Sequence, residues 1–308
     1  MKTLEILNKV AKTLKAAQVE SAEKEAEVIV RQGLGIDTSE MYANNPALSD
    51  DRINAIEELL QRRLGREPLQ YILGSEEFLG LKLIIGRGVL IPRPETELMA
   101  EHAIKTVKSY ELRVKRQGTK AQRGKGTEKP STLAVLDLCT GSGCLALALA
   151  REFLEAEVYG TDISNTAIAY AIKNAEINNI KNAVFLKGSL FEPLKKLFTV
   201  HCSLFTVDLI ISNPPYIRTG DIKTLQPEVK DWEPEMALDG GADGLDFYRE
   251  LIPASGRFLK NNGIIMLESG AGQAADVADM LKASGYEEIE ITKDYAGIER
   301  IIQATWKN

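Results

Sequence analysis

The segment Asn213-Pro214-Pro215-Tyr216 combines residue types that could bind a planar nitrogen group. It directly follows the apolar, strand-like run 209–211, and proline has no N–H for a sheet, so the strand must end here. The side-chain carbonyl of Asn213 and the backbone carbonyl of Pro214 could each accept an N–H, while Tyr216 could stack on a flat group. A rigid strand stop with Asn213 as a turn residue is the alternative interpretation.

A second group of residues could bind an adenosine cofactor. The segment AVLDLCTGSGCLALALA, residues 134–150, has the pattern of a strand, a glycine turn and an apolar helix. Gly141 and Gly143 allow the backbone to approach a ligand beside helix N–H groups. Asp162 follows the next expected strand, where a carboxylate can accept from ribose hydroxyls. A glycine turn alone also serves packing, so the prediction depends on its combination with Asp162.

The details of this turn argue against a dinucleotide cofactor. Ala146 stands where a dinucleotide fingerprint has its third glycine, and Asp137 adds a carboxylate at the end of the first strand. The arrangement resembles the first motif of the class I S-adenosylmethionine-dependent methyltransferases, which release S-adenosyl-L-homocysteine. The expected cofactor contacts are Asp137, Cys139, Thr140, Gly141, Ser142, Gly143, Asp162, Leu190 and Asn213.

A doubly wound α/β sheet should position both groups. From Thr132 onward, strand and helix patterns alternate, which predicts a mostly parallel sheet, and two strand-like runs around DYAGIE predict an antiparallel hairpin at its C-terminal edge. Ligands of such sheets bind at the carboxyl ends of the strands near the switch point. We expect strands at 133–139, 157–161, 183–187, 206–212 and 263–268, with helices near 144–154, 164–178, 244–261 and 272–283.

The N-terminal part should form a small all-helical domain. Residues 1–73 show apolar spacing for three long helices and room for short ones near 38–44 and 67–73. Residues 74–92 have strand composition and a glycine turn, which predicts a β-hairpin linker to the domain at 93–308.

One segment of the second domain is strongly basic. Residues 108–129 hold eight Lys or Arg against two Glu, so the rest of this chain of net charge −6 carries −12. We interpret 108–130 as a solvated, flexible loop inserted into the domain, with a phosphate-contacting arm that meets ribosomal RNA as the alternative. The acidic body argues against a stable nucleic-acid partner.

Composition argues against several other classes. Cys139, Cys144 and Cys202 form no CxxC pair, and the chain has only His102 and His201, so we expect neither a disulfide framework nor a metal site. No run approaches the ~18 apolar residues of a membrane helix, and the start lacks the apolar block of a signal peptide. These features predict a cytoplasmic protein without membrane contact.

Five separated blocks together resemble the HemK/PrmC-type glutamine methyltransferases: GVLIPRPETE, DLCTGSGCLALALA, ISNPPYI, EPEMALDGGADGLDFYR and LESGAGQ. The resemblance covers nearly the whole chain. It implies methylation of the side-chain amide nitrogen of the glutamine in the Gly-Gly-Gln motif of class I peptide chain release factors. On this assignment the helical domain would help to recognise the release factor, and we expect a monomer. The resemblance also implies that Asn213, Pro214, Pro215 and Tyr216 bind the substrate amide, with Asn213, Pro214 and Tyr216 catalytic.

The resemblance leaves some positions open. Cys139 stands where glycine is common, and Ser189 stands where aspartate is frequent near the adenine, although Leu190 could still pack against the base. Arg93 and Glu95 should lie near the site, with interdomain structure as the alternative. Two further polar residues of the fifth block, Glu268 and Gln273, are interpreted as structural.

Three other functions remain as alternatives. A sister enzyme modifies a glutamine of a large-subunit ribosomal protein, and nucleic-acid adenine methyltransferases share the [N/D]PP[Y/F/W] motif. The full PRPETE string favours the release factor over the first, and the acidic body counts against the second. A catalytically idle cofactor-binding scaffold is disfavoured by the intact Asn213–Tyr216 motif and Asp162.

Overall fold

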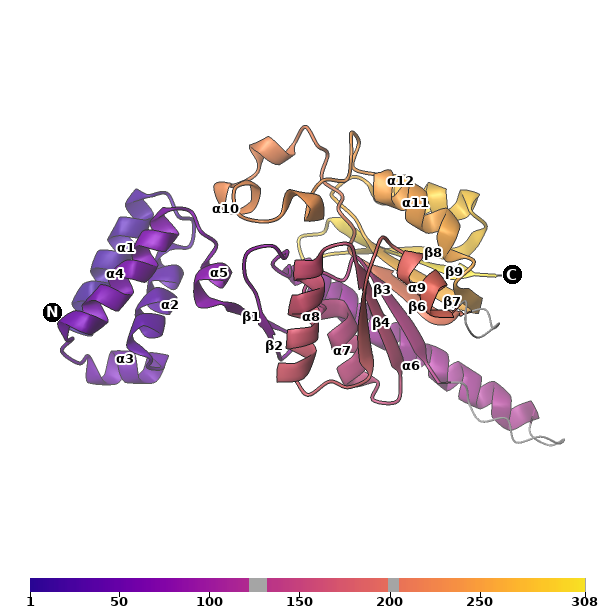
Figure 1. The fold of residues 1–308 in the computed structure, drawn as a ribbon, viewed down its shortest axis with the longest axis horizontal. Helices are drawn as coiled ribbons and strands as arrows, with labels where there is room; N and C mark the ends of the chain where they lie inside the picture. Colours follow the sequence, from indigo (N-terminus) through magenta and orange to yellow (C-terminus); the bar gives the residue numbers. More distant parts are fainter. Residues whose placement is uncertain (122–131, 199–204, 308) are drawn as a thin grey trace. The chain divides into compact units, whose positions relative to one another are not determined.

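The computed structural model describes residues 1–121, 132–198 and 205–307 (Figure 1). The chain divides into two compact units. The helical unit consists of Met1–Ser75 together with Gln226–Trp232, and the α/β unit consists of Glu76–Leu225 and Glu233–Asn308. This division differs from the predicted one in two places, because the hairpin residues from Glu76 onward belong to the α/β unit and residues 226–232 belong to the helical unit.

The helical unit is built on amphipathic helices that share one apolar core. Its centre includes Ile6, Val10 and Leu14 of the first helix and Ile29 and Ile56 of two others, all at most 1% exposed. Its helices are α1 (Thr3–Ala16), α2 (Ala22–Leu34), α3 (Thr38–Asn44), α4 (Asp50–Leu64), α5 (Leu69–Leu73) and the short α10 (Pro227–Lys230).

A buried arginine holds α10 on this unit. The Arg63 side chain, 5% exposed, pairs with Glu25 at 2.5 Å and with Glu228 of α10 at 2.8 Å. Arg66 also pairs with Glu228 at 2.8 Å. Because a buried charge is tolerated only when it is paired, the three groups depend on one another. Residues 226–232 are thus anchored within the helical unit through Glu228.

We expect Arg63→Met to lower the free energy of unfolding by about 3 kcal/mol, because it leaves the partly buried carboxylates of Glu25 and Glu228 without that partner. Urea denaturation of the full chain measures this change. The matched control is Lys9→Met, which removes an exposed pair with Glu57 (2.9 Å) and should change stability by less than about 1 kcal/mol. Equal effects of the two substitutions would contradict the structural role of Arg63.

Apart from Ser75, the hairpin of β1 (Ser75–Phe78) and β2 (Leu81–Ile84) belongs to the α/β unit, and the long helix α6 (Pro94–Ala121) follows it. The expectation of a loop from residue 108 is wrong as far as Ala121, since α6 continues through this basic stretch. Residues 111–117, ELRVKRQ, are mostly strong helix formers, and this propensity sustains the helix without a regular apolar face. The remaining positions of that prediction, 122–130, lie outside the described residues.

The central sheet confirms the doubly wound prediction. Five parallel strands are followed by an antiparallel C-terminal hairpin, in the order β5-β4-β3-β6-β7-β9-β8, so the switch point lies between β3 and β6. The strands are β3 (Ala134–Leu138), β4 (Glu157–Asp162), β5 (Ala183–Lys187), β6 (Val207–Ser212), β7 (Leu259–Glu268), β8 (Tyr286–Lys293) and β9 (Glu299–Trp306).

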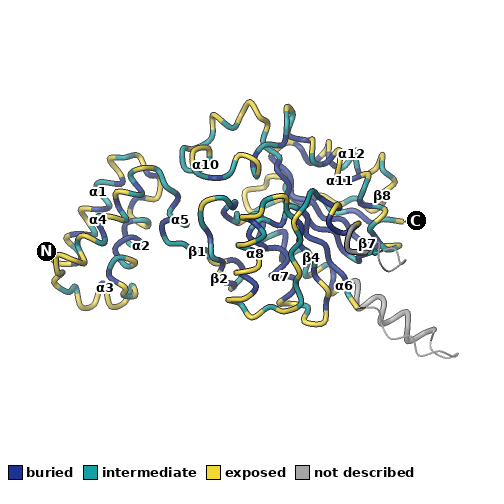
Figure 2. The backbone as a smooth tube through the Cα atoms, in the orientation of Figure 1, coloured by how far each residue is buried: buried dark blue, intermediate teal, exposed yellow. Residues whose placement is uncertain are grey.

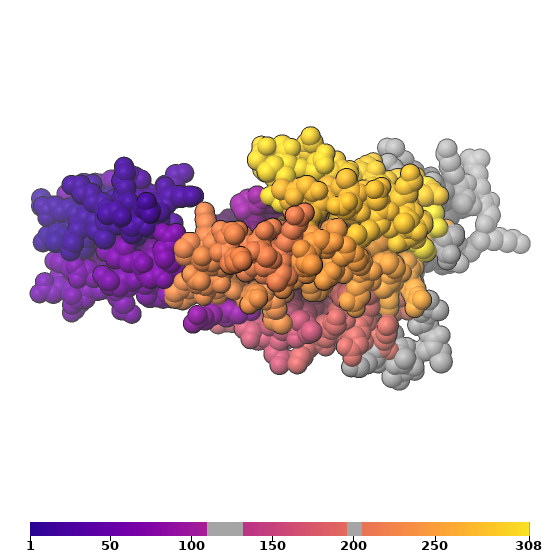
Figure 3. Space-filling model, turned by 90° about the horizontal axis from the view of Figure 1, so that it is seen from above, coloured from indigo at the N-terminus to yellow at the C-terminus, as the bar shows by residue number. Residues whose placement is uncertain are grey.

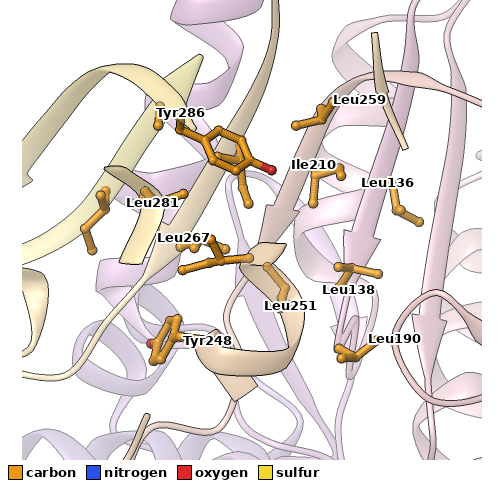
Figure 4. Packing of buried hydrophobic residues seen from close by; sticks show 14 of the residues in the cluster. Leu136, Leu138, Leu190, Ile210, Tyr248, Leu251, Leu259, Leu267, Leu281 and Tyr286 are labelled. Atoms are coloured by element: carbon orange, nitrogen blue, oxygen red, sulfur yellow. The ribbon is translucent and has the colours of Figure 1, made fainter. Parts of the chain in front are cut away.

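Helices pack on the sheet, whose central strands β3, β6 and β7 are largely buried (Figure 2). On one face Leu136, Ile210 and Leu267 of the strands meet Tyr248 and Leu251 in a single apolar cluster (Figure 4). Helix α12 (Ala274–Ala283) lies beside the C-terminal hairpin, shown in yellow in Figure 3, and packs against α11 (Asp246–Ser255). The helices between the strands are α7 (Cys144–Glu152), α8 (Asn165–Ile177), α9 (Glu192–Phe198), α11 (Asp246–Ser255) and α12 (Ala274–Ala283), with the 3₁₀ turns η1 (Ile222–Thr224) and η2 (Glu235–Ala237).

One predicted helix is too long. The expectation of a helix over 244–261 is wrong at its end, because α11 stops at Ser255 and β7 starts at Leu259. Leu251, Ile252 and Leu259 all enter the same apolar cluster, so apolar spacing could not mark the change of structure. None of the described helices has the length and apolar character needed to cross a membrane.

Candidate active site

A cavity of about 380 Å³ opens at the carboxyl ends of β3, β4 and β6. Its volume is that of a small-molecule site, and it lies at the switch point where such sheets bind ligands. Of the residues predicted from sequence, those that line it are Cys139, Thr140, Gly141, Ser142, Asp162, Leu190, Asn213 and Pro215. Asp137, Gly143, Pro214 and Tyr216 are not among the lining residues.

The glycine turn is shaped by two different requirements. Gly141 has φ +55° and space around it, since a Cβ there would have no neighbour nearer than 4.0 Å. Gly143 has φ +83°, and a Cβ there would lie 3.1 Å from both Ala171 and Phe185. Gly143 is therefore required by packing against α8 and β5, whereas Gly141 keeps the turn open toward the cavity.

Asp137 lies beneath the turn rather than on the cavity surface. It is fully buried, and its Oδ2 accepts from Thr140 Oγ1 at 2.6 Å and from the Ala146 N–H at 3.2 Å. Burial raises the pKa of Asp137 to about 7, although both hydrogen bonds oppose this shift. The structure thus gives Asp137 a role in holding the turn and the start of α7, which differs from the direct contact expected from sequence.

Asp162 faces the cavity at the end of β4. Its Oδ2 accepts from the Gly141 N–H at 2.9 Å and its Oδ1 accepts from the Ser164 N–H at 2.8 Å. Each carboxylate oxygen can accept a second hydrogen bond, so both retain capacity for a ligand donor. Burial raises the pKa of Asp162, while the two backbone donors oppose the rise.

Two lining residues adopt left-handed backbone conformations without being glycine. Cys139 has φ +58° and Leu190 has φ +42°, a conformation that disfavours side chains with a Cβ. The turn therefore accommodates Cys139 in the conformation that the more common glycine would adopt. Burial raises the pKa values of the Cys139 and Cys144 thiols, and both cysteines are free.

The Asn213–Tyr216 motif is fixed from three other elements. Asn213 Nδ2 donates to Thr96 Oγ1 of α6 at 3.0 Å, and the Tyr216 hydroxyl donates to Glu268 Oε1 at the end of β7 at 3.4 Å. Gln273, immediately before α12, donates from Nε2 to the Tyr216 carbonyl at 2.9 Å. Both Glu268 and Gln273 are buried beside the motif.

A glycine-rich turn allows close backbone approach to the motif. A Cβ at Gly240 would lie 2.8 Å from the Pro215 carbonyl oxygen, and one at Gly244 would lie 2.3 Å from the Tyr216 carbonyl oxygen. Only glycine fits at either position. This requirement explains the block ALDGGADG, whose Leu238 carbonyl also accepts from the Ile217 N–H at 2.9 Å.

Sequence reasoning placed Arg93 near the site without assigning its partner. Arg93 Nη2 pairs at 2.5 Å with Glu233, which is 5% exposed and also accepts from the Ile91 N–H at 3.3 Å. Arg93 does not line the cavity, whereas Pro92 before it and Pro234 after Glu233 do. The pair thus joins two walls of the cavity within the α/β unit.

Asn174 of α8 is a further residue beside the site that the sequence pattern does not predict. It donates from Nδ2 to the Ser142 carbonyl at 3.0 Å and accepts the Ile84 N–H at 2.6 Å, so it ties the glycine turn to the hairpin. A single asparagine inside a helix gives no signal of such a role. Glu233, by contrast, belongs to EPEMALDGGADGLDFYR, one of the five blocks that resemble the methyltransferase family.

Two family models match the chain. Residues 5–74 match the PrmC N-terminal domain and residues 129–303 match a methyltransferase domain. The release factor glutamine methyltransferase of Thermodesulfovibrio yellowstonii is 42% identical over 280 residues, which cover 91% of each chain. The enzyme of the same name from Geobacter sulfurreducens is 41% identical over 285 residues, which cover 92% of this chain and 89% of the relative.

The solved structures are more distant. The delta-N METTL16 methyltransferase domain aligns with a TM-score of 0.50 at 19% identity, covering 74% of this chain and 90% of that one. At this identity the likeness extends to the fold alone.

Proposed function

Because this chain belongs to the release factor glutamine methyltransferase family, we propose that it transfers a methyl group from S-adenosyl-L-methionine to a release factor. The acceptor is the side-chain amide nitrogen of the glutamine in the Gly-Gly-Gln motif of class I peptide chain release factors. The observation that carries this proposal is the position of Asn213, which lines the cavity and is anchored through its amide nitrogen. These release factors act in the cytoplasm, which we propose as the site of the enzyme.

The cavity fits the proposed cofactor. Asp162 offers two carboxylate oxygens with spare lone pairs, and Gly141 leaves open space beside the turn. Apolar lining residues such as Leu190 and Ile163 suit an adenine ring. We assign the ribose hydroxyls to Asp162, the adenine to Leu190 and the amino-acid end to the turn 139–142. Bound there, the cofactor supplies an electrophilic methyl group and leaves as S-adenosyl-L-homocysteine.

The protein would act on the acceptor by orientation. The lone pair of a glutamine amide nitrogen is delocalised, so this nitrogen is a poor nucleophile. The Asn213 side-chain carbonyl and the Pro214 backbone carbonyl would accept its two N–H bonds, directing the nitrogen toward the methyl group and favouring the positive charge that develops on it. Tyr216 would pack on the amide plane, its hydroxyl held by Glu268.

We expect purified enzyme to transfer one labelled methyl group to the Gly-Gly-Gln glutamine of a class I release factor, located by peptide mass spectrometry. A release factor with that glutamine replaced by alanine is the matched control and should accept none. Transfer to a large-subunit ribosomal protein or to an adenine, with none to the release factor, would replace the substrate assignment and keep the methyltransferase fold.

The same assay examines the helical unit. We propose that this unit contacts the release factor outside the Gly-Gly-Gln loop, as the separate match to the PrmC N-terminal domain suggests. The intact release factor should then have a lower KM than a short Gly-Gly-Gln peptide. Equal KM values would contradict a recognition role for the helical unit.

A further inference from the structure

We propose that Thr96 and Glu268 are positioning residues that determine which end of the Asn213 amide faces the substrate. The inference rests on the proposed function, because it concerns how Asn213 presents its carbonyl oxygen to the glutamine amide. Neither residue has to touch the reacting atoms for this role. Thr96 lies in the first turn of α6 and Glu268 lies at the end of β7, far from Asn213 in sequence.

The three residues form a continuous chain of hydrogen bonds. Asn213 Nδ2 lies 3.0 Å from Thr96 Oγ1, and Thr96 Oγ1 lies 2.8 Å from Glu268 Oε2. Thr96 is 2% exposed and Glu268 is 1% exposed, so both groups are largely shielded from bulk solvent. Thr96 and Asn213 line the cavity and Glu268 does not, which leaves the carboxylate behind the site as its support.

The number of hydrogen-bond donors available explains why these hydrogen bonds fix the orientation of the Asn213 amide. An ionised carboxylate only accepts, so the single Thr96 hydroxyl proton must point to Glu268. The Thr96 oxygen can then only accept from Asn213, which selects the amide NH₂ over the amide oxygen. Asn213 Oδ1, to which no described residue donates a hydrogen bond, is left as the acceptor available to a substrate N–H.

The second oxygen of Glu268 strengthens the same orientation. Oε1 accepts from the Tyr216 hydroxyl at 3.4 Å, so one carboxylate supports both ends of the Asn213–Tyr216 motif. The other titratable or charged groups that interact electrostatically with Glu268 are Glu95 on α6, Arg300 on β9, Cys144 at the start of α7 and Tyr248 on α11. The hydroxyl of Tyr248 donates to the Glu268 backbone carbonyl at 2.6 Å, which fixes the strand end.

The ionisation of Glu268 should therefore control the direction of the hydrogen bonds between Glu268, Thr96 and Asn213. Burial raises the pKa of Glu268 to about 7, with Glu95 adding to the shift and Thr96, Arg300 and Tyr216 opposing it. Above this pH the carboxylate is ionised and accepts from Thr96. Below it the acid can donate to Thr96, whose proton is then free to turn to Asn213 and favour the reversed amide. Methyl transfer should decline as the pH falls through about 7.

The direct test compares Thr96→Val with Thr96→Ser in the full chain. Valine keeps the shape and removes the hydroxyl, so kcat should fall about 10- to 100-fold while KM for the release factor and the cofactor Kd stay within about threefold. Serine keeps the hydroxyl and should restore most of the rate. Equal kcat for wild type and Thr96→Val, or equal impairment of both variants, would overturn the inference.

A measurement without substrate separates this inference from the proposed function. In ¹⁵N NMR spectra of the unliganded protein, the Asn213 side-chain amide is identified by its loss in Asn213→Asp. It should shift as the pH crosses about 7 in wild type and Thr96→Ser, and stay unchanged in Thr96→Val. No shift in wild type would overturn the inference. A normal shift without methylation of the glutamine would overturn the proposed function alone.

Glu268→Gln decides whether the pH dependence belongs to this residue. A glutamine side chain can present either its oxygen or its NH₂ to Thr96, so kcat should fall and lose its dependence on pH near 7. Asp137 is the competing origin, since its pKa is also raised to about 7. If kcat of Glu268→Gln still declined below about pH 7 as in wild type, the pH dependence would be assigned to Asp137, and the inference would be contradicted.

Discussion

Replacing Asn213 with alanine is expected to lower kcat for methyl transfer by about 10³-fold, because it removes an acceptor that orients the substrate nitrogen. The cofactor Kd should stay within about threefold of wild type, since alanine leaves Asp162 and the glycine turn untouched. Single-turnover methyl transfer measures the first quantity and isothermal titration with S-adenosyl-L-homocysteine measures the second. The separation of these two effects is what distinguishes an acceptor-positioning residue from a cofactor ligand.

A second partly buried asparagine, Asn182, controls for the general loss of a side-chain amide. Asn182 donates from Nδ2 to the carbonyls of Ala150, Phe153 and Ala156 at 3.0 to 3.1 Å, and it does not line the cavity. Asn182→Ala should reduce stability and leave kcat of the folded enzyme within about twofold of wild type. If Asn213→Ala weakened cofactor binding as much as it slowed transfer, the assignment of Asn213 to the acceptor would be wrong.

The parts of the site that sequence reasoning found are those that local pattern encodes. The glycine turn, Asp162 and the Asn213–Tyr216 motif each follow an apolar strand, so their type and position predict a shared edge of the sheet. The hydrogen-bond chain behind them has no such signal. Thr96 and Glu268 are 172 positions apart. From the sequence, Thr96 in PRPETE is predicted only to lie in the first turn of a helix.

The errors in the predicted fold also lie where local sequence patterns carry little information. Whether the basic residues after 108 form a loop or a helix depends on propensity, because no apolar stripe marks them, and α6 continues to Ala121. The end of α11 was hidden because helix and strand residues enter one apolar cluster. The assignment of 226–232 to the helical unit depends on ion pairs of Glu228 with Arg63 and Arg66, which only the folded chain brings together.

Replacing Asp162 is the second change expected to have a large effect, and it should act on the cofactor instead of the acceptor. Asp162→Ala removes the proposed ribose acceptor and the partner of the Gly141 and Ser164 N–H groups. Loss of charge-assisted hydrogen bonds worth about 2–4 kcal/mol should raise the cofactor Kd by about 30- to 1000-fold. At saturating cofactor, kcat should fall much less than in Asn213→Ala. Titration calorimetry and the cofactor KM check both expectations.

Asparagine substitutions at Asp162 and at Asp208 separate a loss of cofactor contact from the general loss of an aspartate. Asp162→Asn should also weaken binding, because both carboxylate oxygens accept a backbone N–H, and an amide NH₂ would face one of those donors. Asp208 is a partly buried aspartate whose carboxylate accepts from the Ala134 N–H at 2.8 Å and pairs with Lys260 at 2.7 Å, outside the cavity. Asp208→Asn should therefore leave the cofactor Kd within about threefold of wild type.

If Asp162→Asn bound the cofactor as tightly as Asp208→Asn, the ribose hydroxyls would have to be held by another group. The cavity offers no second lining carboxylate at the end of β4 among the described residues, so the adenosine would then have to lie in a different direction.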